Sequence, residues 1–334
     1  MIGIAIANSI GSASYGGSVV LVPTATAATS IGSTSFTANW NAFSGANYYL
    51  LDVSLSSSFS TFVLQDAVAV TNSYNVTGLT SNTTYYYRVR AVTGSDSDAM
   101  AFVNRVYTAG GVLSYNEVTA TNQLVLDLKS YSIWTKMKAI YPMVGASASA
   151  CAQNLKSSSF TGTFNGGWTY ASTGVKGNGV NNYMTTSFNM LTQQPTGANV
   201  GIYVRTPHTG PSSYPVAWDC SVPPIFNYLG GSQWVDSYLG TTSTLIGDSA
   251  GYTGFFQRSG SVGIQNRRLN NLNKGTNSVN YTAANTNMLL GIYDNYTNNS
   301  ETAFFSLGDY ITTTEQDNFY TAVQAFQTTL SRQV

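Results

Sequence analysis

Alternation of side-chain character in short runs constrains the fold of this chain more than any other feature. In the run TYYYRVRAV (84–92), one face carries Tyr85, Tyr87, Val89 and Ala91 and the other carries Tyr86, Arg88, Arg90 and Val92. A period of two residues is typical of a half-buried β-strand. Residues 35–40, 47–56 and 73–79 show strand signals of the same kind. Several short strands in under 90 residues predict a small β-sandwich over residues 22–109.

Individual residues of this segment resemble those of fibronectin type III domains. The matching positions are Val22-Pro23, Trp40, Gly78-Leu79, Tyr85 and the run RVRAV (88–92). The resemblance implies that Trp40 and Leu79 are core residues and that Tyr85 forms a tyrosine corner, with its hydroxyl bonded to nearby backbone. Ser81 stands where the family usually has proline. Because such sandwiches occur in many contexts, we expect a spacer or assembly module.

Charged residues are scarce in this chain. Lys and Arg number 14, Asp and Glu number 14, and together they make up 8% of the 334 residues, against about 25% in an ordinary soluble domain. Without clustered cations the chain lacks the phosphate contacts on which nucleic-acid binding rests. Zero net charge and 23 tyrosines argue against disorder, and no apolar run approaches the roughly 20 residues of a membrane span. We therefore expect no nucleic-acid partner and no membrane insertion.

Residues 1–21 are expected to form an extended N-terminal assembly arm. Ile2, Ile4 and Ile6 alternate and are followed by Gly- and Ser-rich sequence. The first basic residue is Arg88, so we expect no secretory signal, which needs a positive region before its apolar core. An ordered arm would imply a partner surface. The alternative is a first strand folded back on the chain's own domain.

The first 87 residues contain only two charged side chains, those of Asp52 and Asp66. A nearly uncharged arm and sandwich suit permanent packing against neighbouring molecules, because each buried unpaired charge is costly. We therefore expect the N-terminal part to be anchored and the C-terminal part to face solvent or a host surface.

Residues 110–140 are expected to connect two domains and to contain an amphipathic helix. In QLVLDLKSYSIWTKMKAIYP (123–142), apolar residues recur at three and four positions, and three of the six lysines of the chain are present: Lys129, Lys136 and Lys138. One interpretation is a basic docking helix. The favoured interpretation is a helix packed on the next domain with its lysines in solvent.

Residues 141–334 return to short β runs broken by Gly, Asn and Ser, as in NVGIYVRT (199–206) and TAFFSLGDYI (302–311). This pattern predicts a larger antiparallel sandwich or jelly roll. A final helix is expected to pack against it. Thr312 and Glu315 form its capping box, and its apolar stripe consists of Phe319, Val323, Phe326 and Leu330, ending at Arg332.

Several strings of this second domain resemble a concanavalin A-like, laminin-G-type domain of structural proteins from tailed bacteriophages, notably those that infect Bacteroidetes. They are KMKAIYPMVGASASA (136–150), NLKSSSFTGTFNGGWTYASTGVKGNGVNNYMTT (154–186), FFSLGDYITTTEQDNFYTAVQAFQTTL (304–330) and the terminal SRQV (331–334). The resemblance spans roughly residues 130–334 and implies a virion component: a tail, fibre or head-decoration protein. Because lectins and glucanases share the fold, carbohydrate contact is a second expectation.

No residue pattern points to catalysis. The Glu-x-Asp-x-Glu string of the glucanase relatives is missing, and the nearest acid pairs are Asp96/Asp98 in a turn and Glu315/Asp317 in the first turn of the last helix. The only histidine, His208, lies in a Pro- and Gly-rich loop, and no Gly-x-Ser-x-Gly elbow accompanies it. We expect the chain not to be an enzyme.

The chain contains few residues that could bind a metal ion or form a disulfide. One histidine and two cysteines cannot complete a zinc site without carboxylates. We expect no cofactor, although a structural calcium ion stays open as an alternative through Asp219, Asp236 and Asp248, whose spacing matches no calcium loop. Two unpaired thiols at Cys151 and Cys220 are favoured over a single disulfide.

The segment 206–240 is the strongest sequence candidate for glycan binding. It contains five of the eight prolines with interleaved aromatic residues. An aromatic face with neighbouring amide and carboxylate groups suits a pyranose, so the candidate residues are Tyr214, Trp218, Asp219, Gln233, Trp234 and Asp236. The favoured alternative is that these aromatics anchor a long loop to the sandwich.

Together these observations predict a mainly β protein, with a fibronectin type III sandwich followed by a concanavalin A-like jelly roll and a C-terminal helix. The predicted function is a non-enzymatic structural protein of a tailed-bacteriophage virion, with other virion proteins and further copies of itself as partners. The first alternative is a glycan-binding module that attaches to a host-surface polysaccharide. The second alternative is a secreted polysaccharide-active enzyme.

Overall fold

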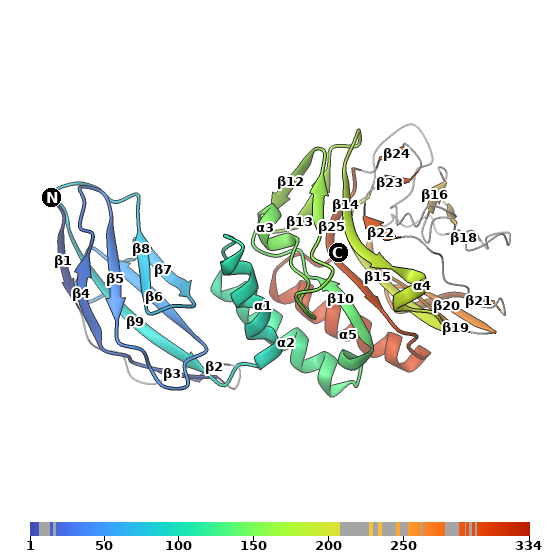
Figure 1. Ribbon diagram of the computed structural model, residues 1–334, viewed down its shortest axis with the longest axis horizontal. Coiled ribbons are helices and arrows are strands. Elements are labelled where there is room, and N and C mark those ends of the chain that lie inside the picture. Colours follow the sequence, from blue (N-terminus) through green and yellow to red (C-terminus); the bar gives the residue numbers. More distant parts are fainter. Residues whose placement is uncertain are drawn as a thin grey trace. The chain divides into compact units, whose positions relative to one another are not determined.

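The computed structural model describes residues 1–6, 14–15, 18–207, 253–261, 263–277 and 299–334, together with six short strands between 227 and 297. The chain divides into two compact units (Figure 1). Unit 1 consists of residues 1–100 and 112–118, and unit 2 consists of residues 101–111 and 119–334. The prediction of a mainly β protein with sandwich sheets and a C-terminal helix is confirmed.

Unit 1 is a β-sandwich of two sheets. The larger sheet contains, in spatial order, β2 (Ser14–Tyr15), β3 (Ser18–Leu21), β9 (Thr84–Thr93), β6 (Tyr48–Ser54) and β7 (Leu64–Ala69), and β1 (Gly3–Ile6) also pairs with β9. The smaller sheet contains β4 (Ala25–Thr29), β5 (Phe36–Trp40) and β8 (Ser73–Val76). Alternate residues of both sheets meet in one apolar cluster, as the period-2 pattern requires.

The core of unit 1 contains Trp40, Leu79 and Tyr85, which are 2%, 5% and 3% exposed. The Tyr85 hydroxyl accepts a hydrogen bond from the Thr80 N–H at 2.9 Å and donates one to the Thr80 carbonyl at 3.4 Å. This is the geometry of a tyrosine corner, in which a buried phenol finds its polar partners in nearby backbone.

The expectation of an extended arm is wrong for residues 2–6. Strand β1 pairs in parallel with β9, from Gly3 opposite Thr84 to Ile6 opposite Tyr87. Ile2 is 4% exposed and belongs to the core cluster. Apolar burial therefore holds this segment on unit 1, as in the alternative of a first strand folded back on the chain's own domain.

The outer face of the large sheet in unit 1 carries a compact ion-pair cluster. Asp52 is 1% exposed and accepts hydrogen bonds from Arg88 Nε at 2.8 Å and Arg90 Nη2 at 3.1 Å. Arg90 also pairs with Asp66, and the Arg88 guanidinium lies 4.3 Å from the ring centroid of Phe59. Pairing of this kind is what allows a carboxylate to be buried.

The connector differs from the predicted helix. Helix α1 (Ser97–Thr108) was not expected, and α2 (Tyr115–Ser130) begins eight residues before the helical run. The start of α2 is fixed by a capping box in which Glu117 Oε2 accepts from the Ser114 N–H at 2.8 Å. After a residue with positive φ, Ser132 at 59°, the chain forms a short 3-10 turn, η1 (Trp134–Lys136), and then strand β10 (Met137–Tyr141). The helix prediction over 131–142 is therefore wrong.

The lysines of this segment form contacts within unit 2. Lys136 Nζ lies 2.5 Å from Glu315 Oε1, and Lys138 Nζ lies 3.2 Å from Asp309 Oδ2. Lys129 Nζ lies 5.7 Å from the ring centroid of Trp134, within the range of a cation–π contact. The side chains of Lys136 and Lys138 are 35% and 36% exposed, so they contact solvent as expected and at the same time tie the connector to the C-terminal part of the chain.

Unit 2 is built on a large antiparallel sheet. It contains, in spatial order, β12 (Trp168–Ala171), β13 (Gly174–Gly177), β25 (Glu301–Gly308), β15 (Gly197–Thr206), β19 (Gly254–Ser261), β20 (Ile264–Leu269) and β21 (Leu272–Asn277), and β10 also pairs with β25. A second sheet contains β11 (Thr163–Asn165), β14 (Tyr183–Asn189) and β22 (Asn287–Leu290). The short helices are α3 (Ala148–Cys151) and α4 (Met190–Gln193).

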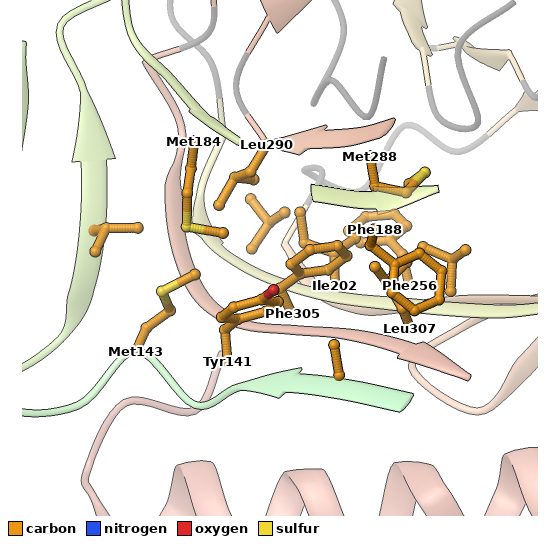
Figure 2. Close-up of a cluster of buried hydrophobic side chains, with 14 of the residues drawn as sticks. Tyr141, Met143, Met184, Phe188, Ile202, Phe256, Met288, Leu290, Phe305 and Leu307 are labelled. Atoms are coloured by element: carbon orange, nitrogen blue, oxygen red, sulfur yellow. The ribbon is translucent and has the colours of Figure 1, made fainter. Parts of the chain in front are cut away.

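The main core of unit 2 lies between these two sheets. Figure 2 shows Met184 and Phe188 of β14 and Met288 and Leu290 of β22 facing the side chains of the large sheet. On β25, Phe305 and Leu307 point into this core. The two sheets thus form the predicted sandwich, with one layer of apolar side chains between them.

The other face of the large sheet is covered by helix α5 (Thr313–Thr329). Phe304 of β25 lies 6.1 Å from Phe319 and 6.4 Å from Phe326 between ring centroids, and Phe255 of β19 lies 5.2 Å from Phe319. The capping box of Thr312 and Glu315 and the buried Phe319, Val323 and Phe326 agree with the expectation from the sequence. Leu330, the last residue of the predicted stripe, is the C-cap of the helix and is only half-buried. Because both faces of the sheet are covered here, β25 is buried along almost its whole length.

Arg332 follows α5 and is wholly buried. Its guanidinium donates to the carbonyls of Met143 at 2.9 Å, Pro142 at 2.8 Å and Ala303 at 3.0 Å, and its Nε donates to Gln327 Oε1 at 2.7 Å. One side chain thus joins the segment after β10, strand β25 and helix α5. Hydrogen bonds to a charged group are stronger than neutral ones.

Replacing Arg332 by alanine should lower the free energy of unfolding by at least about 3 kcal/mol, because three buried carbonyls lose their donor and a cavity opens. Urea unfolding followed by circular dichroism measures the change. Gln333→Ala, at an exposed neighbouring position, is the control and should leave the midpoint unchanged. An equal effect of both variants would contradict a specific role of the guanidinium.

Stability should also depend on pH through Glu315. Partial burial raises its pKa, but hydrogen bonds from Lys136 and Thr312 outweigh burial, so the pKa lies below its ordinary value. A carboxyl with a lowered pKa stabilises the fold above the unfolded-state value, and this contribution is lost as pH falls through the folded-state pKa. The native chain should therefore melt at a higher temperature than Glu315→Gln, and this difference should be largest near pH 7.

The difference between the native chain and Glu315→Gln should shrink as the solution is acidified below about pH 4, the range in which glutamate titrates. Lys136→Met is the matched variant, because it removes the partner and keeps the carboxyl. It should lower the melting temperature at pH 7 and weaken the acid dependence. A constant difference between pH 7 and pH 3 would show that the carboxylate charge does not matter.

Candidate functional site

Most residues of the predicted glycan site lie outside the described residues. These are Tyr214, Trp218, Asp219 and Asp236. Gln233 and Trp234 lie on β17 (Gln233–Val235), which pairs with β16 (Asn227–Leu229) and β18 (Leu245–Gly247) in a small antiparallel sheet. The gathering of the six residues into one site therefore stays a prediction.

The residues considered for catalysis and metal binding fall into two groups. His208, Cys220 and Asp248 lie outside the described residues, so neither the cysteine pairing nor the calcium alternative is tested. Cys151 is buried, and its thiol donates to the Val144 carbonyl at 3.4 Å. Among the described residues, no group of three or more His, Cys, Asp and Glu side chains could hold a metal ion.

The acid pairs stabilise helices and helix packing. The Asp96 carboxylate accepts from the Asp98 N–H at 2.9 Å at the start of α1, so these residues belong to a helix N-terminus and not to a simple turn. Glu315 closes the capping box of α5, and Asp317 pairs with Arg268 of β20. Each pair is accounted for by folding.

The described part of unit 2 contains a different cluster of aromatic and amide side chains, here called the β12 patch. It consists of Phe164, Trp168, Tyr170, Asn178, Val180 and Asn181. Phe164 comes from β11, Trp168 and Tyr170 come from β12, and the other three come from the loop after β13. Strand β12 is an edge strand of the large sheet, so the patch lies at the rim of the sandwich.

Two glycines allow the loop to approach the turn between β11 and β12. Gly166 has a φ of 76°, and a Cβ there would collide with the Asn181 carbonyl. A Cβ on Gly167 would collide with the Asn178 side chain. Both positions therefore need glycine, the first for its backbone conformation as well as for space.

Amide side chains hold the loop in one conformation. Asn181 Oδ1 accepts from the Gly167 N–H at 3.2 Å and from Asn178 Nδ2 at 2.8 Å. Asn178 Oδ1 accepts from the Val180 N–H at 2.9 Å, and the Asn178 N–H donates to the Gly167 carbonyl at 2.9 Å. Val180 is consequently presented at the tip with 74% of its surface exposed.

The three aromatic rings of the patch pack edge to face at the margin of the main core of unit 2, where they are half-buried. The ring centroid of Phe164 lies 5.2 Å from those of Trp168 and Tyr170, with interplanar angles of 74° and 89°. Trp168 Nε1 donates to the Asn165 carbonyl at 2.9 Å. Burial, together with the nearby Cys151 thiol, raises the pKa of Tyr170 to about 12. Its hydroxyl therefore stays protonated at neutral pH and can donate a hydrogen bond.

The patch combines apolar ring surface with neutral donors and acceptors. Side-chain amides offer both kinds of group, and aromatic residues with a polar handle suit surfaces that are apolar at one end and wet at the other. This is chemistry suited to a sugar. Sequence reasoning missed the patch because its residues come from two separate runs, NGGWTY (165–170) and GNGVNN (177–182), and from Phe164. Both runs contain Gly and Asn, which are typical of close turns.

Comparison with solved structures finds distant similarities, among them the following. The botulinum neurotoxin serotype D binding domain has a TM-score of 0.42 and 10% identity, over 57% of this chain and 52% of that one. Domain 4 of AbnA, a GH43 extracellular arabinanase from Geobacillus stearothermophilus in complex with arabinotriose, has a TM-score of 0.36 and 14% identity, over 57% and 98%. Trypanosoma rangeli sialidase in complex with 2,3-difluorosialic acid has a TM-score of 0.45 and 8% identity, over 92% and 61%.

This chain thus spans about half the length of the neurotoxin domain and 61% of the sialidase. With every TM-score below 0.5, these similarities carry no argument about activity. No curated protein matches the sequence. No helix among the described residues is long and apolar enough to cross a membrane.

One family model matches the sequence directly. It is that of the fibronectin type III domain, and it covers residues 22–102. The matched segment contains β4 to β9 and the tyrosine corner at Tyr85. Residues 22–102 are therefore a fibronectin type III domain.

Proposed function

We propose that this chain is a non-enzymatic structural protein of a tailed-bacteriophage virion, serving in a tail, a fibre or a head decoration. Its location would be the virion, and its partners would be other virion proteins and further copies of itself. Unit 2 would be a concanavalin A-like domain displayed on the particle. The fibronectin type III domain would act as a spacer or assembly module.

The observation that supports this proposal is the position of the residues that resemble phage structural proteins. The string 304–330 forms most of β25, the capping box and α5, and SRQV contains Arg332. KMKAIYP contains β10, which pairs with β25. The resemblance therefore falls on the residues that hold unit 2 together, as expected for a shared fold.

Quantitative proteomics of gradient-purified virions tests the proposal. The protein should be found at many copies per particle and should keep a constant ratio to the major capsid protein through successive purification steps. A phage replication protein from the same lysate is the control and should be depleted at each step. Loss of this protein together with the control would show that it is not part of the virion.

The second candidate function is binding of a host-surface glycan, and the β12 patch is the observation that favours it. Phe164, Trp168 and Tyr170 supply partly exposed rings, and Asn178 and Asn181 supply amides on a hydrogen-bonded loop. A preformed loop loses little conformational entropy when a ligand binds. A displayed structural protein can have this activity as well, so the two candidates are compatible.

Binding of the full chain to a glycan array that includes host polysaccharides tests this second function. Trp168→Leu and Val180→Glu should each weaken binding by about tenfold or more. The first variant removes a central aromatic contact, and the second places a charge in an apolar contact. Phe62→Leu, at a partly exposed aromatic of unit 1, is the control and should bind as the native chain does.

Other outcomes of the array separate the remaining alternatives. Loss of binding only in Trp218→Ala and Trp234→Ala would place the site in segment 206–240. No binding by the native chain would contradict the glycan function and leave the virion proposal intact. We expect no release of reducing sugar from bound polysaccharides, and release would support the polysaccharide-active enzyme.

A further inference from the structure

Strand β9 presents one edge that is covered by segments from the beginning of the chain. β6 pairs with β9 from Tyr86 to Val92 on one side. On the other side, β1 pairs with residues 84–87 in parallel and β3 pairs with residues 91–93 in antiparallel orientation. In seven-stranded sandwiches this edge belongs to the strand that follows in sequence. Here the chain enters α1 after β9, so β1 and β3 take that place.

The position of β1 is specified by its side chains. Ile2 is 4% exposed and is part of the core cluster, and Ile4 packs against the same cluster, whereas Ile6 is 39% exposed. Residues 2, 4 and 6 share one face of the strand, and that face meets the core at Ile2 and Ile4 and leaves it at Ile6. The edge of β9 and the apolar site for Ile2 and Ile4 therefore form a slot that selects an alternating apolar strand in one register.

A small residue fits best at one position of the slot, Gly3. The Gly3 N–H donates to the Thr83 carbonyl at 3.0 Å. A Cβ at Gly3 would lie 2.8 Å from Thr84 Oγ1, so the Thr84 side chain would have to move, and a branched residue such as valine would crowd it further. The sequence Ile-Gly-Ile thus matches the slot both in its apolar residues and in its small one.

We propose that this slot accepts residues 2–6 of a second copy of the chain, so that neighbouring copies exchange strand β1. The inference deepens the self-association in the proposed function and gives it a surface. The added strand binds by β-augmentation, in which main-chain hydrogen bonds give affinity and alternate side-chain pockets give specificity.

Exchange between identical chains is favoured by symmetry. The slot makes the same contacts with β1 of either copy, so no hydrogen bond or apolar contact is lost when the strand comes from a neighbour. No charged side chain lies in residues 1–51, so two copies can approach through this region without like-charge repulsion. A high local concentration, as in a repeated assembly, shifts the balance from the chain's own strand toward a neighbour's.

Disulfide trapping tests the exchange in the full chain, with both native cysteines first replaced (Cys151→Ala and Cys220→Ala) so that each variant carries one introduced cysteine. Ala5 lies opposite Tyr86 in the register of β1 and β9, and paired strands bring Cα atoms within the range of a disulfide. Ala5→Cys is placed on one chain and Tyr86→Cys on a differently tagged chain. The two are mixed at about 1 mM, comparable with the effective concentration of a short linker, and oxidised. A covalent heterodimer then forms only if β1 of one copy reaches β9 of the other.

The control mixture pairs Ala5→Cys with Thr37→Cys, which lies on β5 in the opposite sheet. The proposal expects several times more heterodimer in the Ala5/Tyr86 mixture than in this control, and loss of that excess when Gly3→Val is added to the Ala5→Cys chain. Equal yields in the two mixtures would overturn the exchange. They would leave the virion proposal standing, because detection in purified particles does not depend on strand exchange.

Discussion

Burial of both faces of β25 is the constraint on which unit 2 depends. Phe305 and Leu307 fill the core between the sheets, while Phe304 contacts the aromatic residues of α5. A strand with two covered faces must be apolar almost throughout, and TAFFSLG satisfies this requirement. The Ala303 carbonyl of the same strand also accepts a hydrogen bond from Arg332. Both apolar layers and the buried guanidinium therefore converge on β25.

Scarcity of charge is the second general property, and the structure shows how the few charges are used. Arg205 pairs with Glu301, Arg268 with Asp317, and Asp52 with two arginines, so charged groups fix elements to one another within each unit. The other polar residues of the chain are neutral, because charged residues make up only 8% of the sequence. A surface of neutral polar residues can donate and accept hydrogen bonds but exerts no long-range electrostatic attraction. It therefore suits long-lived neutral contacts better than fast, electrostatically steered association.

Much of the fold could be predicted from the sequence, because it follows from local pattern. The strands around Phe36, Tyr48 and Tyr87 follow from period-2 alternation, and α5 follows from its capping box and its stripe. Helix α1 was missed, because Asp96 and Asp98 fit a turn as well as a helix N-terminus. Residues 137–141 were assigned to a helix because the helical spacing of the preceding residues extends to Met137. Pairing with β25, a contact distant in sequence, decides in favour of the strand.

The candidate site and the position of β1 were less predictable, because both depend on contacts between residues that are distant in sequence. The apolar alternation of Ile2, Ile4 and Ile6 was visible, but the strand could equally fill its own domain or a neighbour's. That choice depends on the free edge of β9, which exists because the chain forms helix α1, and not another strand, after β9. No local sequence pattern reveals this edge.

The β12 patch likewise exists only because Gly166 and Gly167 let a loop from beyond β13 approach the turn after β11. In both places a glycine leaves room for a neighbouring segment, because a Cβ would meet the Asn181 carbonyl at Gly166 and the Thr84 side chain at Gly3. If the patch binds a glycan, amide hydrogen bonds and ring contacts supply the affinity, and these are not screened by salt as ion pairs are. A chain with so little charge would thus keep its contacts at the ionic strengths that weaken charged binding proteins.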